Sequence, residues 1–291
     1  MLFFLALCLL ARFAYAFNDV LVGATARELD RFEVAALRGL SLGITMSPLL
    51  VFVPAAAWAA LAERWPTYLL LVALTGICNV LQNHAARFLP FGLRAAVTIS
   101  TVSIATVLFG SLAYGERLSA VQGALCLVLV GSAVVAAFGE HAAHDIEPDI
   151  PRGGALALAA GALLGTAAML TKGLSAETSP LLTAWAWEFG AGAILAGPLL
   201  YRWWRRGTGP GVGRRFLRTA LASAPTAVGS GASMIAIGLG PLGVWGAVAG
   251  TQVLFIALLG VRWHREAMGL RRWLCLLAAA LAVAGLALVR R

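Results

Sequence analysis

Apolar runs separated by short polar segments fill almost the whole chain. A helix that crosses the hydrocarbon core of a bilayer needs about 20 apolar residues, and the runs match this length. The pattern predicts ten helices, near residues 2–24, 34–60, 67–88, 91–114, 119–139, 153–175, 179–201, 216–238, 242–263 and 270–289. The connections between these helices are short, so no room remains for a separate soluble domain.

The composition supports a membrane location. Of the 291 residues, 60% are hydrophobic and 12% are charged, and the mean hydropathy is +0.87. Soluble domains carry about 25% charged residues. The sequence therefore predicts an all-α, multi-pass integral membrane protein. It argues against receptors with large ectodomains, ATP-driven pumps and membrane-tethered enzymes.

The formal net charge of +9 comes mainly from arginines at the ends of the predicted helices. Membrane proteins place basic residues there to fix their orientation and to meet lipid headgroups. We therefore expect the lipid bilayer as a partner, and no nucleic acid.

The second half of the chain repeats landmarks of the first half at an offset of about 150 residues. The Ser-Pro-Leu-Leu segment at 47–50 aligns with Gly-Pro-Leu-Leu at 197–200. With one residue of slippage, Leu-Cys-Leu at 125–127 aligns with the same tripeptide at 274–276. These landmarks follow one order at nearly one offset, which indicates an internal repeat.

Each half contains five predicted helices, an odd number, so the second half must enter the membrane from the opposite side. We expect two inverted five-helix repeats around a central cavity, residues 1–139 and 152–291, joined by a linker at 140–151. Inverted repeats are typical of secondary transporters, because two halves of opposite orientation can exchange conformations around a site at the membrane midplane.

The segment from residue 90 to 136 carries a family resemblance. It begins with Pro-x-Gly at 90–92, continues through a hydroxyl-rich helix to a Gly-Glu-Arg-Leu turn at 115–118, and ends in a helix with spaced glycines. Together with Arg38 and Lys172, this pattern resembles the ten-helix EamA-type branch of the drug/metabolite transporter superfamily. The chain departs from that pattern at Thr98-Ile99-Ser100-Thr101 and at His264-Arg265-Glu266-Ala267.

The resemblance implies a basket of ten helices around a central cavity, with helices five and ten on the outside. It also implies transport of a small metabolite. It gives no support to catalysis or to a bound cofactor.

Polar side chains at membrane depth are candidates for the substrate site, because a polar group in hydrocarbon is costly unless it has a partner. At an offset of about 151 they form three pairs, which we predict to line the cavity: Asn79 with Ser230, Gln82 with Ser233, and Thr101 with Gln252. The alternative is that these residues only hydrogen-bond neighbouring helices to one another.

Glu188 is the acidic residue most deeply embedded in an apolar run, and the repeat aligns it with Arg38. A carboxylate in a low-dielectric site must be protonated or paired. Glu188 could therefore bind a substrate amine, carry a coupling proton, or form a structural ion pair with Arg12 or Arg38. A position at the membrane interface is a further alternative. Arg12 could instead meet a substrate carboxylate. Trp187 and its neighbour Trp185 could form an aromatic wall for a flat or cationic ligand.

Catalytic and metal-binding patterns are weak. The residues His141, His144, Asp145, Glu147 and Asp149 fall in the expected linker with unspecific spacing, so we expect no metal site. No Ser/His/Asp, Cys/His or two-carboxylate arrangement stands out in the sequence. We expect no catalytic residues, no cofactor and no enzymatic activity.

The expected function is secondary active transport of a small metabolite across a bacterial inner membrane by alternating access. The resemblance implies an amino acid as substrate and export as the direction. One alternative is a carrier of cationic amines or drugs. An alternative from another class is a non-transporting membrane enzyme or assembly factor. A coupling proton and a monomeric or homodimeric state are compatible with the sequence.

The distribution of basic residues conflicts with the orientation that the resemblance implies. Lys and Arg concentrate in the connections that follow odd-numbered helices, above all between Arg202 and Arg218. The positive-inside rule then predicts both termini outside the cell. Similar family members usually keep both termini inside.

Overall fold

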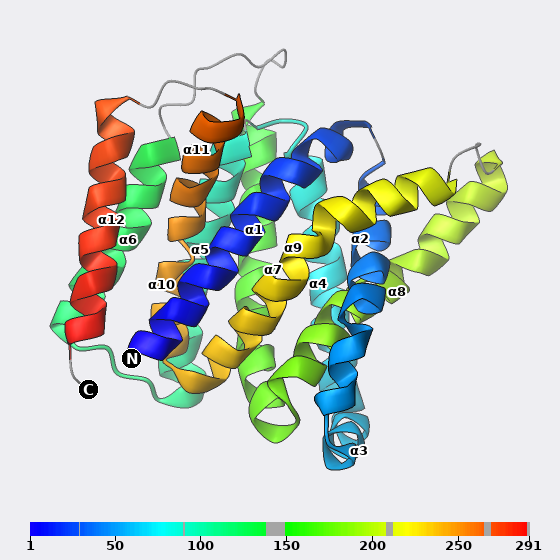
Figure 1. Cartoon of the computed structure of the whole chain (residues 1–291), viewed down its shortest axis with the longest axis horizontal. Helices are drawn as coiled ribbons and strands as arrows, with labels where there is room; N and C mark the ends of the chain where they lie inside the picture. The colour runs from blue at the N-terminus through cyan, green and yellow to red at the C-terminus, as the bar shows by residue number, and fades with distance from the viewer. Residues whose placement is uncertain (29, 90, 138–148, 208–211, 265–268, 290–291) are drawn as a thin grey trace.

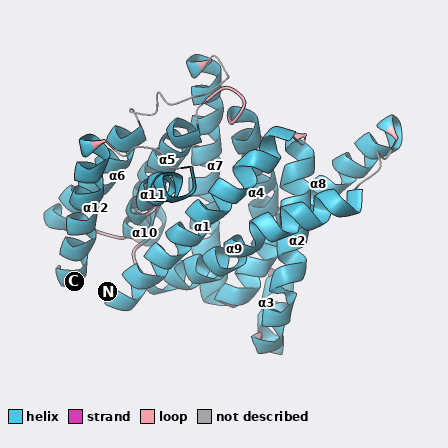
Figure 2. Cartoon of the chain, turned by 45° about the horizontal axis from the view of Figure 1, so that its top comes forward, coloured by secondary structure: helices cyan, strands magenta, loops and turns pink. Residues whose placement is uncertain are grey.

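All regular elements in the part of the chain that the structure describes are helices. This computed structural model describes residues 1–28, 30–89, 91–137, 149–207, 212–264 and 269–289 (Figures 1 and 2). The helices are α1 (Leu2–Glu28), α2 (Arg31–Met46), the 3₁₀ helix η1 (Ser47–Phe52), α3 (Ala55–Glu63), α4 (Trp65–Ala85), α5 (Phe91–Tyr114), α6 (Ala120–Ala137), α7 (Ile150–Glu177), α8 (Pro180–Arg206), α9 (Val212–Leu239), α10 (Leu242–Val248), α11 (Thr251–His264) and α12 (Leu270–Leu288). The all-helical fold class is confirmed.

The long helices run alternately up and down the bundle; α6 and α12 stand nearly upright in Figure 1, whereas α8 and α9 are strongly tilted. Near the middle of the bundle, α1 packs against α9 and α11, α2 packs against α8, and α7 packs against α4 and α5. At one edge, α6 and α12 pack against each other. Both helices carry exposed apolar side chains, such as Leu127 and Leu281. Helices α6 and α12 correspond to the fifth and tenth predicted helices, so their position matches the expectation that these two lie on the outside.

The helix predicted over 34–60 is wrong in detail, because the chain is broken there. Helix α2 ends at Met46, a 3₁₀ helix follows, and α3 starts after Pro54. Proline lacks an amide hydrogen and fits best in the first turn of a helix. Pro48 lies in the first turn of the 3₁₀ helix, and Pro54 directly precedes α3 as its N-cap. Pro198, which the repeat aligns with Pro48, lies inside the continuous helix α8.

The helix predicted over 242–263 is also broken, at Ala249 and Gly250. The amide of Gly250 donates to the carbonyl of Ala247 at 3.0 Å, and that of Gln252 donates to Ala249 at 3.0 Å. Such i to i−3 bonds tighten the chain into a turn. A Cβ atom on Gly250 would lie 3.1 Å from the carbonyl oxygen of Leu129, so a side chain there would crowd α6. The turn separates the fully buried α10 from α11.

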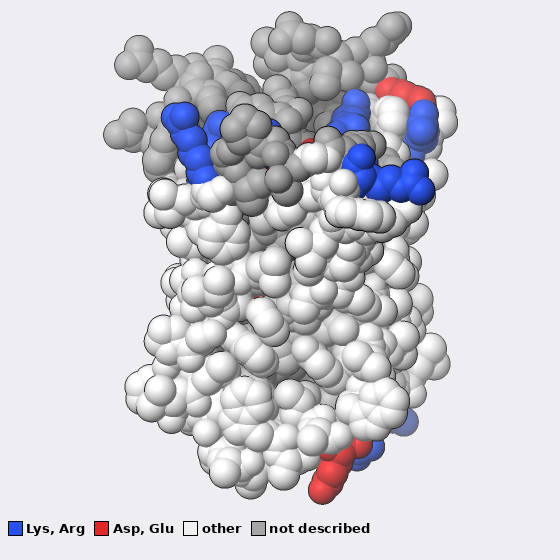
Figure 3. Space-filling view, turned by 90° about the vertical axis from the view of Figure 1, so that its right-hand side faces the viewer, with Lys and Arg blue, Asp and Glu red and all other residues white. Residues whose placement is uncertain are grey.

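The surface and the helix lengths fit a bilayer. Eight of the described helical segments are long and apolar enough to cross a membrane, and α6 is apolar but shorter. Helix α8 is not among the eight, and it carries Glu188 and three arginines at its end. On the face drawn in Figure 3, a broad belt of uncharged surface separates two charged ends. The chain is therefore an integral, multi-pass membrane protein.

Glycines let α2 and α8 cross with their backbones in contact. A Cβ atom on Gly39 would lie 2.5 Å from the amide nitrogen of Gly192 and 2.7 Å from the carbonyl oxygen of Glu188. Small residues permit such close approach between membrane helices. The crossing brings Arg38, the neighbour of Gly39, next to Glu188.

Candidate functional site

An ion pair between Arg38 and Glu188 lies inside the helical bundle. Arg38 Nη1 lies 3.2 Å from Glu188 Oε2, and Nη2 donates to Oε1 at 3.5 Å. The Glu188 side chain is only 2% exposed and that of Arg38 is 16% exposed. Burying two charges costs free energy that their attraction only partly returns, so the pair is poorly explained by fold stability alone.

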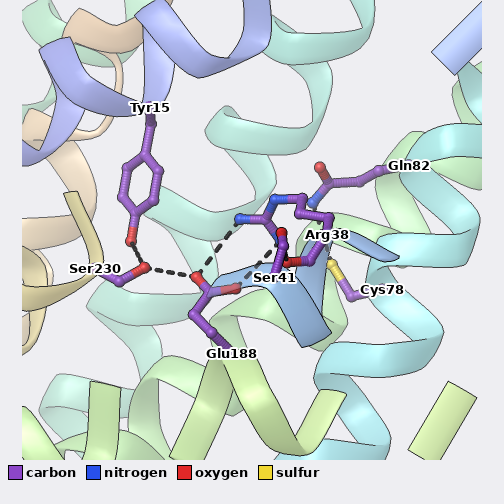
Figure 4. Close-up of polar contacts among 7 residues, drawn as sticks. All are labelled: Tyr15, Arg38, Ser41, Cys78, Gln82, Glu188 and Ser230. Atoms are coloured by element: carbon purple, nitrogen blue, oxygen red, sulfur yellow. Dashed lines mark hydrogen bonds and ion pairs between the residues drawn. The ribbon is translucent and has the colours of Figure 1, made fainter. Parts of the chain in front are cut away.

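Two hydroxyl groups extend this pair into a chain of polar contacts (Figure 4). Ser230 Oγ donates to Glu188 Oε1 at 2.5 Å, and the hydroxyls of Tyr15 and Ser230 lie 3.1 Å apart. The four side chains come from α1, α2, α8 and α9. Glu188 Oε2 has no hydrogen-bond partner with suitable geometry, which leaves the carboxylate able to accept a further donor.

One face of α1 carries three polar residues toward three other helices. Arg12, Tyr15 and Asp19 are spaced i, i+3 and i+7, so they share that face. The Arg12 guanidinium lies 4.3 Å from the centroid of the Trp245 ring on α10. Asp19 Oδ2 accepts a hydrogen bond of 2.8 Å from Gln252 Nε2 on α11. Together with Tyr15, these residues give α1 a polar face toward the site.

Ser233 on α9 is linked to Arg12 through Trp245. Trp245 Nε1 donates to Ser233 Oγ at 3.2 Å, and both residues are buried. This bond fixes the indole ring over which the guanidinium of Arg12 lies.

On α4, Gln82 Nε2 donates to Cys78 Sγ at 3.2 Å, as Figure 4 shows. The backbone carbonyl of Gln82 accepts from Arg94 Nη1 at 3.1 Å. Asn79 Nδ2 is buried and has no hydrogen-bond partner. The α4 side therefore contributes polar groups, one of them unsatisfied, close to the Arg38 end of the site.

The three symmetric pairs are equivalent positions of the two repeats, and their lining of one cavity stays a prediction. Within the described residues, no hydrogen bond links Asn79 with Ser230, Gln82 with Ser233, or Thr101 with Gln252. Thr101 Oγ1 instead donates to the carbonyl of Val97 in its own helix at 2.8 Å. The pair that does meet across the repeat alignment is Arg38 with Glu188.

Arg38, not Arg12, is the arginine that pairs with Glu188. No carboxylate of the described residues lies within ion-pair distance of Arg12. This leaves Arg12 as a cation held between aromatic rings.

The two tryptophans predicted to form an aromatic wall near Glu188, Trp187 and Trp185, differ in their surroundings. Trp187 is 7% exposed and belongs to the main hydrophobic core. Trp185 donates from Nε1 to the carbonyl of Gly43 at 3.0 Å and stacks on Phe189, with ring centroids 5.0 Å apart. Trp58 meets Trp185 edge to face at 5.8 Å.

Tyr15, Asp19 and Trp245 were missed as site residues in the sequence. The spacing of Tyr15 and Asp19 from Arg12 could have revealed a polar face on an otherwise apolar helix. Trp245 carried no such signal, because an isolated tryptophan in an apolar run is typical of a core residue.

Lys172 takes part in a separate cluster at the end of the helices. Its ammonium group contacts the Glu116 carboxylate and donates to the Gly240 carbonyl at 2.9 Å. Glu116 also accepts from the backbone amides of Leu242 at 2.9 Å and Gly243 at 3.4 Å. The Gly-Glu-Arg-Leu turn is thereby tied to the end of α7 and the start of α10.

No metal centre is evident among the described residues. Among the described residues, no group of three or more His, Cys, Asp or Glu side chains is placed to hold a metal ion. The linker residues His141, His144, Asp145 and Glu147 lie outside the described part. Asp149 caps the start of α7, where it accepts from the Arg152 amide at 3.1 Å.

Comparison with known proteins fits this architecture. A search of curated protein sequences found no match. A solved crystal structure resembles the chain with a TM-score of 0.76 at 15% sequence identity. The match covers 97% of this chain and 96% of the chain in that structure. At that identity the likeness shows a shared fold alone. The profile of the EamA-like transporter family matches twice, over residues 2–138 and 151–290. The chain therefore belongs to the EamA-like transporter family, the membrane transporters that the sequence pattern indicated.

Proposed function

We propose that this protein is a secondary active transporter that moves a small metabolite, in the first instance an amino acid, by alternating access. The observation that carries the proposal is the buried Arg38–Glu188 pair with its hydroxyl partners Ser230 and Tyr15. Ionisable residues inside a membrane protein commonly mark a substrate or proton pathway. Export across a bacterial inner membrane is the direction and location that we propose with it.

The mechanism starts from competition for the Glu188 carboxylate. A substrate ammonium group can replace the Arg38 guanidinium, because Oε2 of Glu188 still has acceptor capacity. Replacement would release Arg38 and loosen the contact between α2 and α8. A proton on Glu188 would break the same pair, so one carboxylate could couple substrate binding to proton movement.

The proposed architecture is ten membrane-spanning helices arranged as two inverted repeats around a central cavity. The repeats are residues 1–139 and 152–291, joined by the linker 140–151. The two family matches support the repeat. The Arg38–Glu188 pair supports its symmetry, since the partners occupy corresponding positions 150 residues apart. The alternation of helix direction along the chain in Figure 1 supports the inversion.

Asn79, Gln82, Thr101, Trp187, Glu188, Ser230, Ser233 and Gln252 remain our proposed substrate-binding set, with Arg12 and Arg38 as charge partners. We rank Glu188 and Ser230 first because they share a hydrogen bond. Thr101 ranks last, because its hydroxyl is already bonded to its own helix.

A carrier of cationic amines is the second candidate. The observation that favours it is the stack of Trp185 on Phe189, which lie three residues before and one residue after Glu188 along α8. Aromatic faces attract organic cations. The two candidates differ in whether the substrate must carry a carboxylate.

Counterflow in proteoliposomes tests the proposal. Purified protein is reconstituted, the vesicles are loaded with one unlabelled amino acid or quaternary amine, and entry of the same labelled compound is followed. Exchange needs no knowledge of the coupling ion. Saturable accumulation of an amino acid, absent from protein-free vesicles, is the expected result. Accumulation of amines alone would favour the second candidate. Absence of exchange across the panel with folded protein would count against transport of either class.

A further inference from the structure

Arg12 is a buried cation with unused hydrogen-bond donors. The residue is 6% exposed, and both Nε and Nη2 are buried without any hydrogen-bond partner. Nearly all buried polar groups in folded proteins are hydrogen-bonded, and an exception calls for an explanation such as an absent ligand. A guanidinium with two unsatisfied nitrogens inside a membrane protein is a severe exception, because charge adds to the cost of burial.

The aromatic neighbours of Arg12 stabilise its positive charge but provide no hydrogen-bond acceptor for its Nε and Nη2 groups. The guanidinium carbon lies 4.3 Å from the ring centroid of Trp245 and 5.7 Å from that of Tyr15. A ring face attracts the cation. The N–H groups of a guanidinium lie in its own plane, so a ring stacked above it leaves them free to bind in a fork.

The interior acids are already engaged elsewhere. Glu188 pairs with Arg38, Glu33 pairs with Arg215, and Asp19 accepts from Gln252. At the end of the helices, Glu116 pairs with Lys172. Arg12 is therefore a positive charge without an acidic partner among the described residues. A ligand with a single negative charge would neutralise it, whereas a doubly charged group such as a phosphate would bring an excess charge.

From these observations we infer that Arg12, held by Trp245, forms a subsite for the carboxylate of the transported substrate. A carboxylate is planar, so its two oxygens can accept a bidentate pair of hydrogen bonds from two N–H groups of the guanidinium. The inference rests on the proposed function and adds to it the group that the substrate must carry.

The position of this subsite relative to Glu188 defines the ligand further. Tyr15 lies three residues from Arg12, a rise of about 4.5 Å along α1, and its hydroxyl meets Ser230, which donates to Glu188. The carboxylate subsite and the amine-binding carboxylate are thus linked through two hydroxyl side chains. A compound with both charges, such as an α-amino acid, could use both ends.

Ligand-induced thermal stabilisation of the purified full-length protein tests the subsite. The probes are L-phenylalanine, L-leucine, L-threonine and L-cysteine, each compared with its own methyl ester, which keeps the amine and loses the negative charge. The variants are Arg12→Met, Arg12→Lys and a matched control, Arg64→Met, whose arginine lies at an exposed ion pair.

For wild-type protein and for Arg64→Met, at least one amino acid should give the same thermal stabilisation as its methyl ester at a concentration about tenfold or more lower. This difference is expected for a charge-assisted contact. Arg12→Met should lose this preference and bind acid and ester equally. If Arg12→Met does not fold, Arg12→Lys decides, because it keeps the charge but loses the fork. Its preference should fall about tenfold while ester binding stays unchanged.

Two results would overturn the subsite. One is an Arg12→Met variant, or Arg12→Lys if Arg12→Met does not fold, that keeps the wild-type preference for acid over ester. The other is wild-type protein that binds no acid better than its ester. Counterflow separates this failure from failure of the proposed function. Exchange of esters without acids would leave transport intact and refute the subsite. Acid-selective, Arg12-dependent binding without any exchange would support the subsite and refute transport.

Discussion

Arg38 and Glu188 lie 150 positions apart in the chain, and their side chains meet at 3.2 Å inside the helical bundle. The repeat alignment places them at equivalent points of α2 and α8, two helices that cross in backbone contact at Gly39 and Gly192. A pair at this crossing joins the two halves of the chain. Any event that breaks it alters how those halves pack.

The first prediction concerns the energetic coupling of the pair. Glu188→Gln leaves the Arg38 charge buried without a counter-ion, which typically costs about 3 kcal/mol or more. The double variant Arg38→Gln with Glu188→Gln removes both charges and should recover most of that loss. The measurement is thermal unfolding in detergent for the wild type, both single variants and the double variant. Additive losses of stability would show that the two side chains are not coupled.

The second prediction concerns the helix crossing. A Cβ atom on Gly192 would lie 2.6 Å from the carbonyl carbon of Gly39, so Gly192→Ala forces α2 and α8 apart. Overpacking of this kind costs about 1–3 kcal/mol, and the unfolding midpoint should fall. Gly197→Ala on the same helix is the control, because a Cβ atom there meets nothing within 4 Å. Equal behaviour of the two variants would contradict the close crossing.

The third prediction concerns the turn that contains Glu116. This carboxylate binds Lys172 and the backbone amides of Leu242 and Gly243, so Glu116→Gln should lower the unfolding midpoint clearly. Glu177→Gln breaks the exposed pair with Arg64, and exposed pairs contribute less than about 1 kcal/mol. An equal or larger loss from Glu177→Gln would show that the Glu116 cluster does not hold these helices together.

The fourth prediction concerns orientation. The end of α8 and the start of α9 lie at the opposite end of the bundle from the start of α1 and the end of α12 (Figure 1). At that opposite end, Arg202 and Arg215 pair with Asp30 and Glu33. The positive-inside rule places the arginine-rich end in the cytoplasm. A periplasm-active reporter fused after Arg291 should therefore be active, and activity of only a cytoplasm-active reporter would reverse the assignment.

Much of the fold was predictable because a bilayer imposes simple rules. Helices must satisfy their own backbone hydrogen bonds and must reach across about 30 Å of hydrocarbon, so apolar run lengths locate them. The breaks near Pro54 and Gly250 were harder to predict. Apolarity continues through both positions. Pro48 and Pro54 are a sequence signal for the first break, whereas the second is shown by the local hydrogen bonding at Gly250.

The site was predictable only in part. The repeat alignment brought Arg38 opposite Glu188, but Arg12 was an equal candidate for the pair. The choice depends on how each helix is rotated, which a sequence repeat does not determine. The repeat-equivalent residues Thr101 and Gln252 have different local surroundings, which the alignment does not indicate. Thr101 lies in the continuous helix α5, whereas Gln252 follows a turn that redirects α11 toward Asp19.

If Glu188 takes part in transport, its neutralisation must stop exchange. The most direct test is counterflow of the amino acid found for the wild type, measured for Glu188→Gln and for Glu177→Gln as a control acid at an exposed ion pair, each normalised to the amount of folded protein in the vesicles. We predict that Glu188→Gln exchanges no faster than protein-free vesicles while Glu177→Gln keeps the wild-type rate. Wild-type exchange by Glu188→Gln would contradict the account.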